Sequence, residues 1–277
     1  MKKTANEIKD LRLAVLIDAE NVPRNSLKSV LEEAAIYGTP TVKRIYGDWT
    51  SPNVAAWKSA LLENAITPIQ QYSYTTGKNS TDSAMIIDAM DILYEGKTDG
   101  FCIVSSDSDF TRLAIRLREA GMKVIGMGEQ KTPVAFRVAC DKFIYIEVIR
   151  GADEPQKTAK KAQSPKKQTA KVKAEAAAAA DRGGRAAKKD EAAENGIPES
   201  IVKLIADSVS DIADEDGYVF MGELGNLLLK KQPDFDPRNF GYKKLTSLIR
   251  AIGRFEIDAR QSDSGNTKHI YLRDKEN

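Results

Sequence analysis

The feature that most constrains the fold is an alternation of strand-like and helix-like segments over residues 12–150 of the 277-residue chain. Short apolar or β-branched runs predict strands, and longer segments with apolar residues three and four apart predict helices. The predicted strands are residues 12–18, 41–46, 67–72, 100–104, 123–127 and 143–146. The predicted helices are residues 25–37, 54–64, 81–94, 110–120 and 134–140. This alternation predicts an α/β domain with a mostly parallel sheet covered by helices on both faces.

The residue types present exclude several classes of chemistry. No G-x-G-x-x-G follows the first strand and no G-x-x-x-x-G-K-S/T occurs, so neither dinucleotide nor P-loop nucleotide binding is supported. His269 is the single histidine, which leaves no His-based zinc site and no Ser-His-Asp mechanism over most of the chain. Two cysteines, Cys102 and Cys140, are too few for a disulfide framework or a metal–thiolate cluster. Catalysis would therefore depend on carboxylates, with a hard cation.

The charge is concentrated in one segment, although the whole chain carries only +2. Residues 157–190 hold 11 basic and 3 acidic residues, a net of +8, and residues 158–189 include one valine and no aromatic, Leu, Ile or Met. Such a segment cannot bury enough apolar surface to fold, so we predict a disordered basic linker over residues 151–196, between domains at 1–150 and 197–277. It is either a soluble spacer or a tether that grips nucleic-acid phosphates.

The N-terminal segment has charged and polar residues where a signal peptide needs an apolar core. No run approaches the ~18 uninterrupted apolar residues that a membrane span requires. We therefore expect an intracellular, cytoplasmic protein that does not associate with membranes.

Four aspartates occupy positions at which parallel sheets bind ligands. Asp18 ends the first predicted strand, and Asp107 and Asp109 follow the strand at 100–104. Asp82 lies in the first turn of the helix at 81–94, on the apolar stripe that must face the sheet. Any one of these acids could simply cap or stabilise a helix. Their convergence instead predicts a site for Mg²⁺ or Mn²⁺, because crowded carboxylates repel one another and hard cations prefer oxygen ligands.

Two other classes of carboxylate enzyme use similar motifs. The segment DSDFT at 107–111 resembles the nucleophile motif of haloacid-dehalogenase-type phosphatases, but only about 40 residues follow before the linker, too few for that family's downstream motifs. A Toprim fold also places D-x-D after a strand, but it ends its first strand in Glu, where this chain has Asp18.

Three motifs together resemble the NYN family of PIN-like ribonucleases: LIDAEN at 16–21, KNSTDSAMIIDAM at 78–90 and VSSDSDF at 104–110. The resemblance covers the whole first domain. It implies a Rossmann-like (PIN-like) nuclease fold, dependence on a divalent metal, and RNA as the usual substrate class. We expect the RNA to be single-stranded. Many members read K-G-V-D and S-G-D where this chain has KNSTD and SSD, so the acids are retained and the loop shape differs.

The resemblance also implies roles for individual residues. Asp18, Asp82 and Asp107 would be the catalytic, metal-binding acids, and Asp109 a weaker fourth ligand. Asn21 would orient the first acid or the scissile phosphate. Asp88 also falls at an acid position of the motif, but helical geometry places it on the opposite, solvated face of its helix.

Basic residues near these motifs are candidates for binding the substrate. Lys78 would contact a phosphate, with Arg44 and Lys43 as further candidates. Each of them is equally well explained as an ordinary surface cation.

Residues 197–277 predict a second, small domain with helices at 201–212, 221–229 and 242–252 and strands at 255–259 and 269–272. This order is typical of a winged-helix-like α+β domain. The segment PDFDPRNFGYKKLTSLI at 233–249 resembles the LOTUS (OST-HTH) domain, which implies binding of RNA or of a protein partner. Lys243, Lys244 and Arg250 cluster on the third helix, either as a binding surface or as its solvent face. The net charge of −4 over 191–277 weakens a nonspecific phosphate-binding role.

The sequence thus predicts a metal-dependent endoribonuclease whose C-terminal domain recruits RNA or a protein partner. The alternative is a non-catalytic RNA-binding adaptor that retains the nuclease fold. The retained acids favour the enzyme, because an adaptor would be expected to lose at least one metal ligand.

Overall fold

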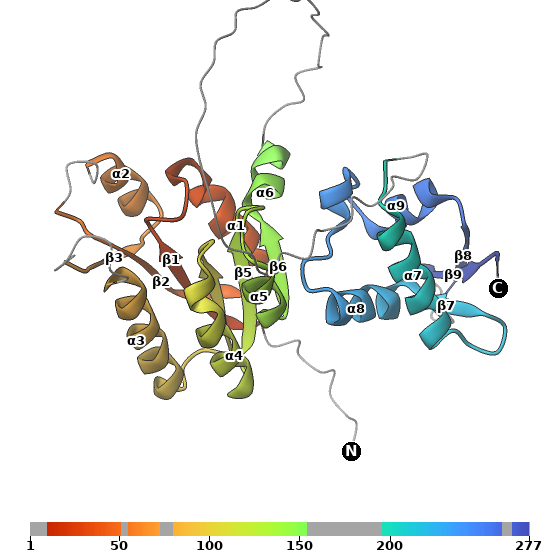
Figure 1. The fold of residues 1–277 in the computed structure, drawn as a ribbon, viewed down its shortest axis with the longest axis horizontal. Helices are drawn as coiled ribbons and strands as arrows, with labels where there is room; N and C mark the ends of the chain where they lie inside the picture. The colour runs from red at the N-terminus through yellow and green to blue at the C-terminus, as the bar shows by residue number, and fades with distance from the viewer. Residues whose placement is uncertain (1–9, 51–54, 73–79, 154–195, 262–267, 277) are drawn as a thin grey trace, which may run out of the picture.

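The computed structural model describes residues 10–50, 55–72, 80–153, 196–261 and 268–276. They form an α/β domain and a smaller C-terminal domain (Figure 1). The segment predicted to be a disordered basic linker lies outside the described residues except at its two ends, and Lys78 lies outside them as well.

The first domain is built on a six-stranded sheet in the order β3-β2-β1-β4-β5-β6. All five neighbouring pairs are parallel, which confirms the predicted Rossmann-like fold class. The strands are β1 (Arg12–Asp18), β2 (Thr39–Gly47), β3 (Thr67–Gln70), β4 (Gly100–Val104), β5 (Lys123–Gly128) and β6 (Lys142–Tyr145). The α-helices are α1 (Leu27–Tyr37), α2 (Ala55–Glu63), α3 (Ser80–Glu95), α4 (Thr111–Glu119), α5 (Val134–Ala139) and α6 (Ile146–Asp153).

The central strand β1 is buried on both faces because its apolar residues alternate between two cores. Leu13, Val15 and Ile17 pack with residues of α1, α2 and α6. Ala14 and Leu16 pack on the other face with residues of α3, α4 and α5. Helices therefore cover both faces of the sheet, as the alternation of the sequence predicts.

The prediction of a strand over 143–146 was wrong at its C-terminal end. The strand ends at Tyr145, and α6 begins at Ile146. Ile146 and Ile149 are buried in the core that α1 also lines, so an apolar pair three residues apart forms one short helical face. A helix of 8 residues offers too few turns for this periodicity to stand out in the sequence.

The C-terminal domain combines three α-helices with an antiparallel sheet in the order β7-β9-β8, which confirms the predicted α+β class. Its elements are α7 (Glu199–Ile212), β7 (Tyr218–Phe220), α8 (Met221–Lys231), the 3₁₀ helix η4 (Pro237–Phe240), α9 (Leu245–Ile252), β8 (Phe255–Gln261) and β9 (Lys268–Asp274). The strand β7 was not predicted, because three residues are too few to show a period of two. The third helix starts at Leu245 rather than at residue 242, since Lys244 has an extended backbone.

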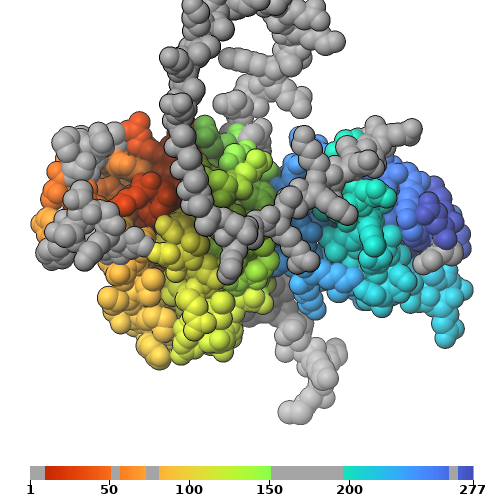
Figure 2. Space-filling view, in the orientation of Figure 1, coloured from red at the N-terminus to blue at the C-terminus, as the bar shows by residue number. Residues whose placement is uncertain are grey.

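The C-terminal domain lies against the β6 edge of the large sheet, where the surfaces of the two domains meet (Figures 1 and 2). The backbone N–H of Phe143 on β6 donates to the carbonyl oxygen of Pro233 over 2.9 Å. Arg238 of η4 reaches α1, where its guanidinium donates to both carboxylate oxygens of Glu33 over 2.7 and 2.9 Å. The docked domain thus covers a sheet edge that would otherwise expose unpaired backbone groups.

In the parts of the chain that the structure describes, we find no helix with the length and apolar character needed to cross a membrane.

Candidate metal centre

The predicted acids gather where the strand order of the large sheet reverses. The chain runs outward in one direction from β1 and in the other from β4, and ligands of open α/β sheets bind beyond the carboxyl ends of the strands at this point. Asp18 is the last residue of β1, and Ser105 to Asp107 follow directly after β4. The helix α3 begins at Ser80 and carries Asp82 in its first turn.

Three of the four predicted acids share one small space. Carboxylate oxygens of Asp82, Asp107 and Asp109 all lie within 4.8 Å of one another. Asp82 comes from the first turn of α3, whereas Asp107 and Asp109 belong to the turn after β4 and the 3₁₀ helix η3 (Ser108–Phe110). Side chains separated by about 25 positions in the sequence therefore converge as their positions at strand and helix ends predict.

Asp18 adjoins this cluster and is held in place by hydrogen bonds. Its side chain is buried, with 1% exposure. One oxygen accepts from the backbone N–H of Glu20 over 2.9 Å. The other accepts from the Nδ2 group of Asn21 and from the Oγ–H of Ser105, each over 2.8 Å. Asn21 therefore orients Asp18, while its contact with a phosphate stays a prediction.

Ser105 links the two central strands of the site and was not singled out from the sequence. Its hydroxyl donates to Asp18 at the end of β1, and its Oγ accepts from the backbone N–H of Asp107 over 3.0 Å. The side chain is fully buried. Its place directly after the apolar strand β4, two residues before an aspartate, is the signal that could have identified it.

Burial and the crowding of carboxylates both make Asp82 a weaker acid. Its pKa is raised to about 6, first by burial, then by the charges of Asp18 and Asp107 and, to a smaller extent, of Asp109 and Glu20. Glu20 was not predicted as part of this site, and the hydroxyl of Thr81 donates to it over 2.8 Å. Several negative charges therefore face one another at this end of the sheet.

Asp107 belongs to the acid cluster and also caps a helix, which is the alternative role predicted from the sequence. One of its oxygens accepts from the backbone N–H of Asp109 over 2.9 Å, which caps η3. A carboxylate has two oxygens with several lone pairs, so capping leaves Asp107 able to bind a cation as well.

Asp88 does not lie on a solvated face, contrary to the prediction from helical geometry. Its carboxylate pairs with the guanidinium of Arg44 and accepts from the hydroxyl of Tyr46. Both partners belong to β2. They reach Asp88 because α3 packs over β2 as well as over β1. Arg44 is thus held by Asp88, and its role in binding substrate stays a prediction.

Replacing Ser105 by alanine is expected to lower the free energy of unfolding by about 2 kcal/mol, because the buried charge of Asp18 loses a donor. Unfolding in urea, followed by tryptophan fluorescence, measures the loss, since Trp49 and Trp57 both lie in the first domain. Ser108→Ala is the matched control, because Ser108 is exposed in the same turn. Equal stabilities of the two variants would contradict the assigned role.

A Rossmann-like sheet with a carboxylate cluster at its switch point defines a domain suited to binding a divalent cation. Comparison with protein families identifies both halves of the chain: residues 12–147 match the NYN domain and residues 196–267 match the OST-HTH/LOTUS domain. The chain therefore contains an NYN domain, with the fold of PIN-like nucleases, followed by an OST-HTH/LOTUS domain. Both kinds of domain are associated with RNA binding.

Solved structures of similar proteins add no function. A protein of unknown function from Vibrio parahaemolyticus is 19% identical over 51% of this chain and 96% of its own, with a TM-score of 0.43. An uncharacterised protein from Nitrosomonas europaea is 28% identical over 43% of this chain and 92% of its own, with a TM-score of 0.25. No curated protein matches the chain.

Proposed function

We propose that this protein is a divalent-metal-dependent endoribonuclease that hydrolyses phosphodiester bonds of single-stranded RNA in the cytoplasm. One observation carries the proposal: the carboxylates of Asp82, Asp107 and Asp109 lie within 4.8 Å of one another, beside the buried Asp18, at the switch point of the sheet. The NYN fold and the association of both domains with RNA support the choice of reaction and substrate.

The donor set fits Mg²⁺ or Mn²⁺. All the gathered groups are carboxylates, and hard cations prefer oxygen ligands. Burial, and then the neighbouring carboxylates, raise the pKa of Asp82, and a bound cation would offset both effects by favouring the ionised form. Asp82, Asp107 and Asp109 would hold the ion, with Asp18 as the fourth acid. When bound, such a cation neutralises charge on a phosphate and makes water more acidic.

The other residues of the proposed site orient an acid or contact the substrate. Ser105 and Asn21 fix the orientation of Asp18, so its negative charge stays directed at the cluster. Lys78 and Arg44 are the proposed contacts with phosphates of the substrate. The C-terminal domain would recruit RNA or a protein partner to the nuclease domain.

Incubation of end-labelled single-stranded RNA with the full-length protein and Mn²⁺ tests the proposal. We expect internal cleavage that EDTA abolishes and that Asp107→Asn reduces by at least ~100-fold, because a metal-binding acid is lost. Isothermal titration with Mn²⁺ alone should show weaker binding to the variant, independently of activity.

Asp91→Asn is the matched control, because Asp91 is exposed on α3 and its replacement removes the same charge. It should cleave as the wild type does. Equal cleavage by Asp107→Asn and the wild type would show that the site is wrongly assigned. RNA binding without cleavage by the wild type would favour the alternative function, a non-catalytic RNA-binding adaptor.

A further inference from the structure

A groove runs between the two domains, at the end of the large sheet opposite to the acid cluster. It consists of two adjoining hollows of about 500 and 490 Å³, which share Tyr37 and Lys142 from the first domain and Asn226 and Leu229 from α8. Lys123 and Lys142 begin β5 and β6, whereas Asp18 ends β1 and Asp107 follows β4. Because the strands are parallel, the groove and the acids lie at opposite ends of them.

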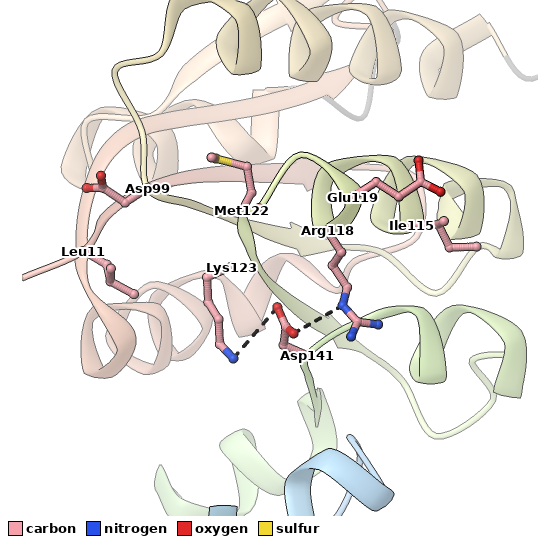
Figure 3. Close-up of a pocket in the computed structure, with 9 residues that line it drawn as sticks. Leu11, Asp99, Ile115, Arg118, Glu119, Met122, Lys123 and Asp141 are labelled. Atoms are coloured by element: carbon pink, nitrogen blue, oxygen red, sulfur yellow. Dashed lines mark ion pairs between the residues drawn. The ribbon is translucent and has the colours of Figure 1, made fainter.

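Positive charge dominates this groove. Seven basic and three acidic side chains line the two hollows. All three acids have partners: Glu33 and Asp236 pair with Arg238, and Asp141 lies 3.2 Å from Arg118 and 3.8 Å from Lys123. Figure 3 shows the side chains of Arg118 and Lys123 reaching Asp141, in a neighbouring hollow at the same end of the strands.

Four lysines line the groove in addition to these ion pairs, and among the described residues none of them has an acidic partner within 4.0 Å. They are Lys142 on β6, Lys230 on α8, and Lys243 and Lys244 before α9. Three of the four are exposed to solvent. Lys142 comes from the first domain and the other three from the C-terminal domain, so docking brings these cations to one groove.

Lys142 is the best placed of the four to receive an anion. Its ammonium nitrogen lies 4.9 Å from the centre of the Tyr37 ring. Burial lowers the pKa of this lysine, which shows that its charge is incompletely solvated. Asp236 and Glu33 act on Lys142 only from beyond ion-pair distance, so a phosphate in the groove could still pair with its ammonium group directly. The half-buried Tyr37 adds an aromatic surface of the kind against which unpaired bases stack.

We propose that this interdomain groove binds the phosphodiester backbone of single-stranded RNA, as a second contact remote from the acid cluster. Unpaired lysines spread over two adjoining hollows fit a chain of phosphates, because each ammonium acts as a compact point charge. The shallow form, continuing from one domain to the other, suits an extended polymer better than a small molecule. The association of both domains with RNA favours RNA over an acidic peptide.

The groove would give the protein a grip on RNA that does not depend on cleavage. The six residues of β5 separate the two ends of the sheet by ~20 Å. An RNA that occupies both places must therefore span more than this distance. Binding can be measured in EDTA, so failure of the groove and failure of the proposed nuclease activity give different results.

Fluorescence anisotropy with a labelled single-stranded RNA and the full-length protein in EDTA tests the proposal. In the double variant Lys243→Glu/Lys244→Glu, the Kd should rise at least ~10-fold, and the slope of log K against log salt should fall by about 1.4, or about 0.7 for each lost phosphate contact. Lys142→Met should weaken binding as well.

The matched control is Lys58→Glu/Lys203→Glu, which changes the charge equally at exposed lysines outside the groove. It should bind RNA almost as the wild type does. The basic segment 157–190 is present in all the variants, so its contribution to binding is the same in each. Equal weakening by both double variants would overturn the groove. Displacement of RNA by poly-glutamate as readily as by unlabelled RNA would overturn the assignment to RNA.

Discussion

Replacing Arg238 by alanine is expected to separate the two domains. The guanidinium of Arg238 bridges Glu33 on α1 and Asp236 before η4, and both carboxylates are almost fully buried. Removal of one partner from a buried ion pair costs about 3–5 kcal/mol, because the remaining charges stay uncompensated. Arg238 is itself 27% exposed, so we expect the lower end, about 3 kcal/mol. Small-angle scattering should then show a larger radius of gyration.

In the described part of the chain, a second group of contacts also joins the two domains. Arg137 and Tyr145 contact the carboxylate of Asp234, and the Phe143–Pro233 hydrogen bond joins the backbones. The Arg137–Asp234 pair is itself mostly buried, with side chains 21% and 13% exposed. Docking therefore depends on both sets of ion pairs, and loss of the Arg238 pairs is expected to shift the domains toward the separated state.

Arg260→Ala is the control for Arg238→Ala. Arg260 and its partner Asp258 are both more than 40% exposed, so this pair should contribute little to stability. The control should scatter as the wild type does. Identical scattering profiles of Arg238→Ala and the wild type would show that Arg238 does not hold the interface.

The segment around Arg238 should also lose stability in acid. Burial raises the pKa of Asp236, but the hydrogen bonds from Arg238 hold it below its ordinary value. The stabilisation from a lowered carboxylate pKa is complete above the unfolded value of about 4 and is lost as the pH falls through the folded value. Loss of this stabilisation is therefore expected only below about pH 4.

The sequence predicts the sheet and the position of the acids well, for a local reason. Short continuous apolar runs such as residues 13–17 are typical of buried strands, and an acid directly after such a strand lies at the carboxyl edge of the sheet. Glycines confirm the helix ends: Gly96 and Gly121 have positive φ after α3 and α4, a conformation that other residues rarely adopt.

The parts that could not be predicted depend on contacts between distant segments. The partners of Asp88 lie on β2, about 40 positions earlier, and helical spacing shows only the face of a residue, not what packs over it. The links from Ser105 to Asp18 and from Arg238 to Glu33 are also long-range. The docking of the two domains, and therefore the basic groove, follows from such contacts.

Asp82→Asn should make the metal-free protein more stable while it abolishes cleavage. The pKa of Asp82 is raised to about 6, chiefly by burial and then by Asp18, so the ionised form destabilises the fold. A raised carboxylate pKa brings no penalty below the unfolded value of about 4, and the penalty grows as the pH rises to the folded value. Because Asp82 is partly exposed, we discount the penalty to about 1 kcal/mol at pH 7.5.

Thermal unfolding in EDTA at pH 7.5 and pH 4 measures this effect. The variant should have the higher Tm at pH 7.5, and the difference should vanish at pH 4, where Asp82 is protonated in the folded wild type. Asp91→Asn, on the exposed face of the same helix, should show no such dependence on pH.

Addition of Mn²⁺ should reverse the order of stability. A ligand that binds only the folded state stabilises it by an amount set by its concentration and Kd, so Mn²⁺ should raise the Tm of the wild type and have little effect on Asp82→Asn. The carboxylates that destabilise the metal-free fold at pH 7.5 would then be the ones that bind the cation. Activity would require these groups in spite of their cost in stability. A variant that is less stable than the wild type in EDTA at pH 7.5 would contradict the proposal that ionised Asp82 destabilises the metal-free fold.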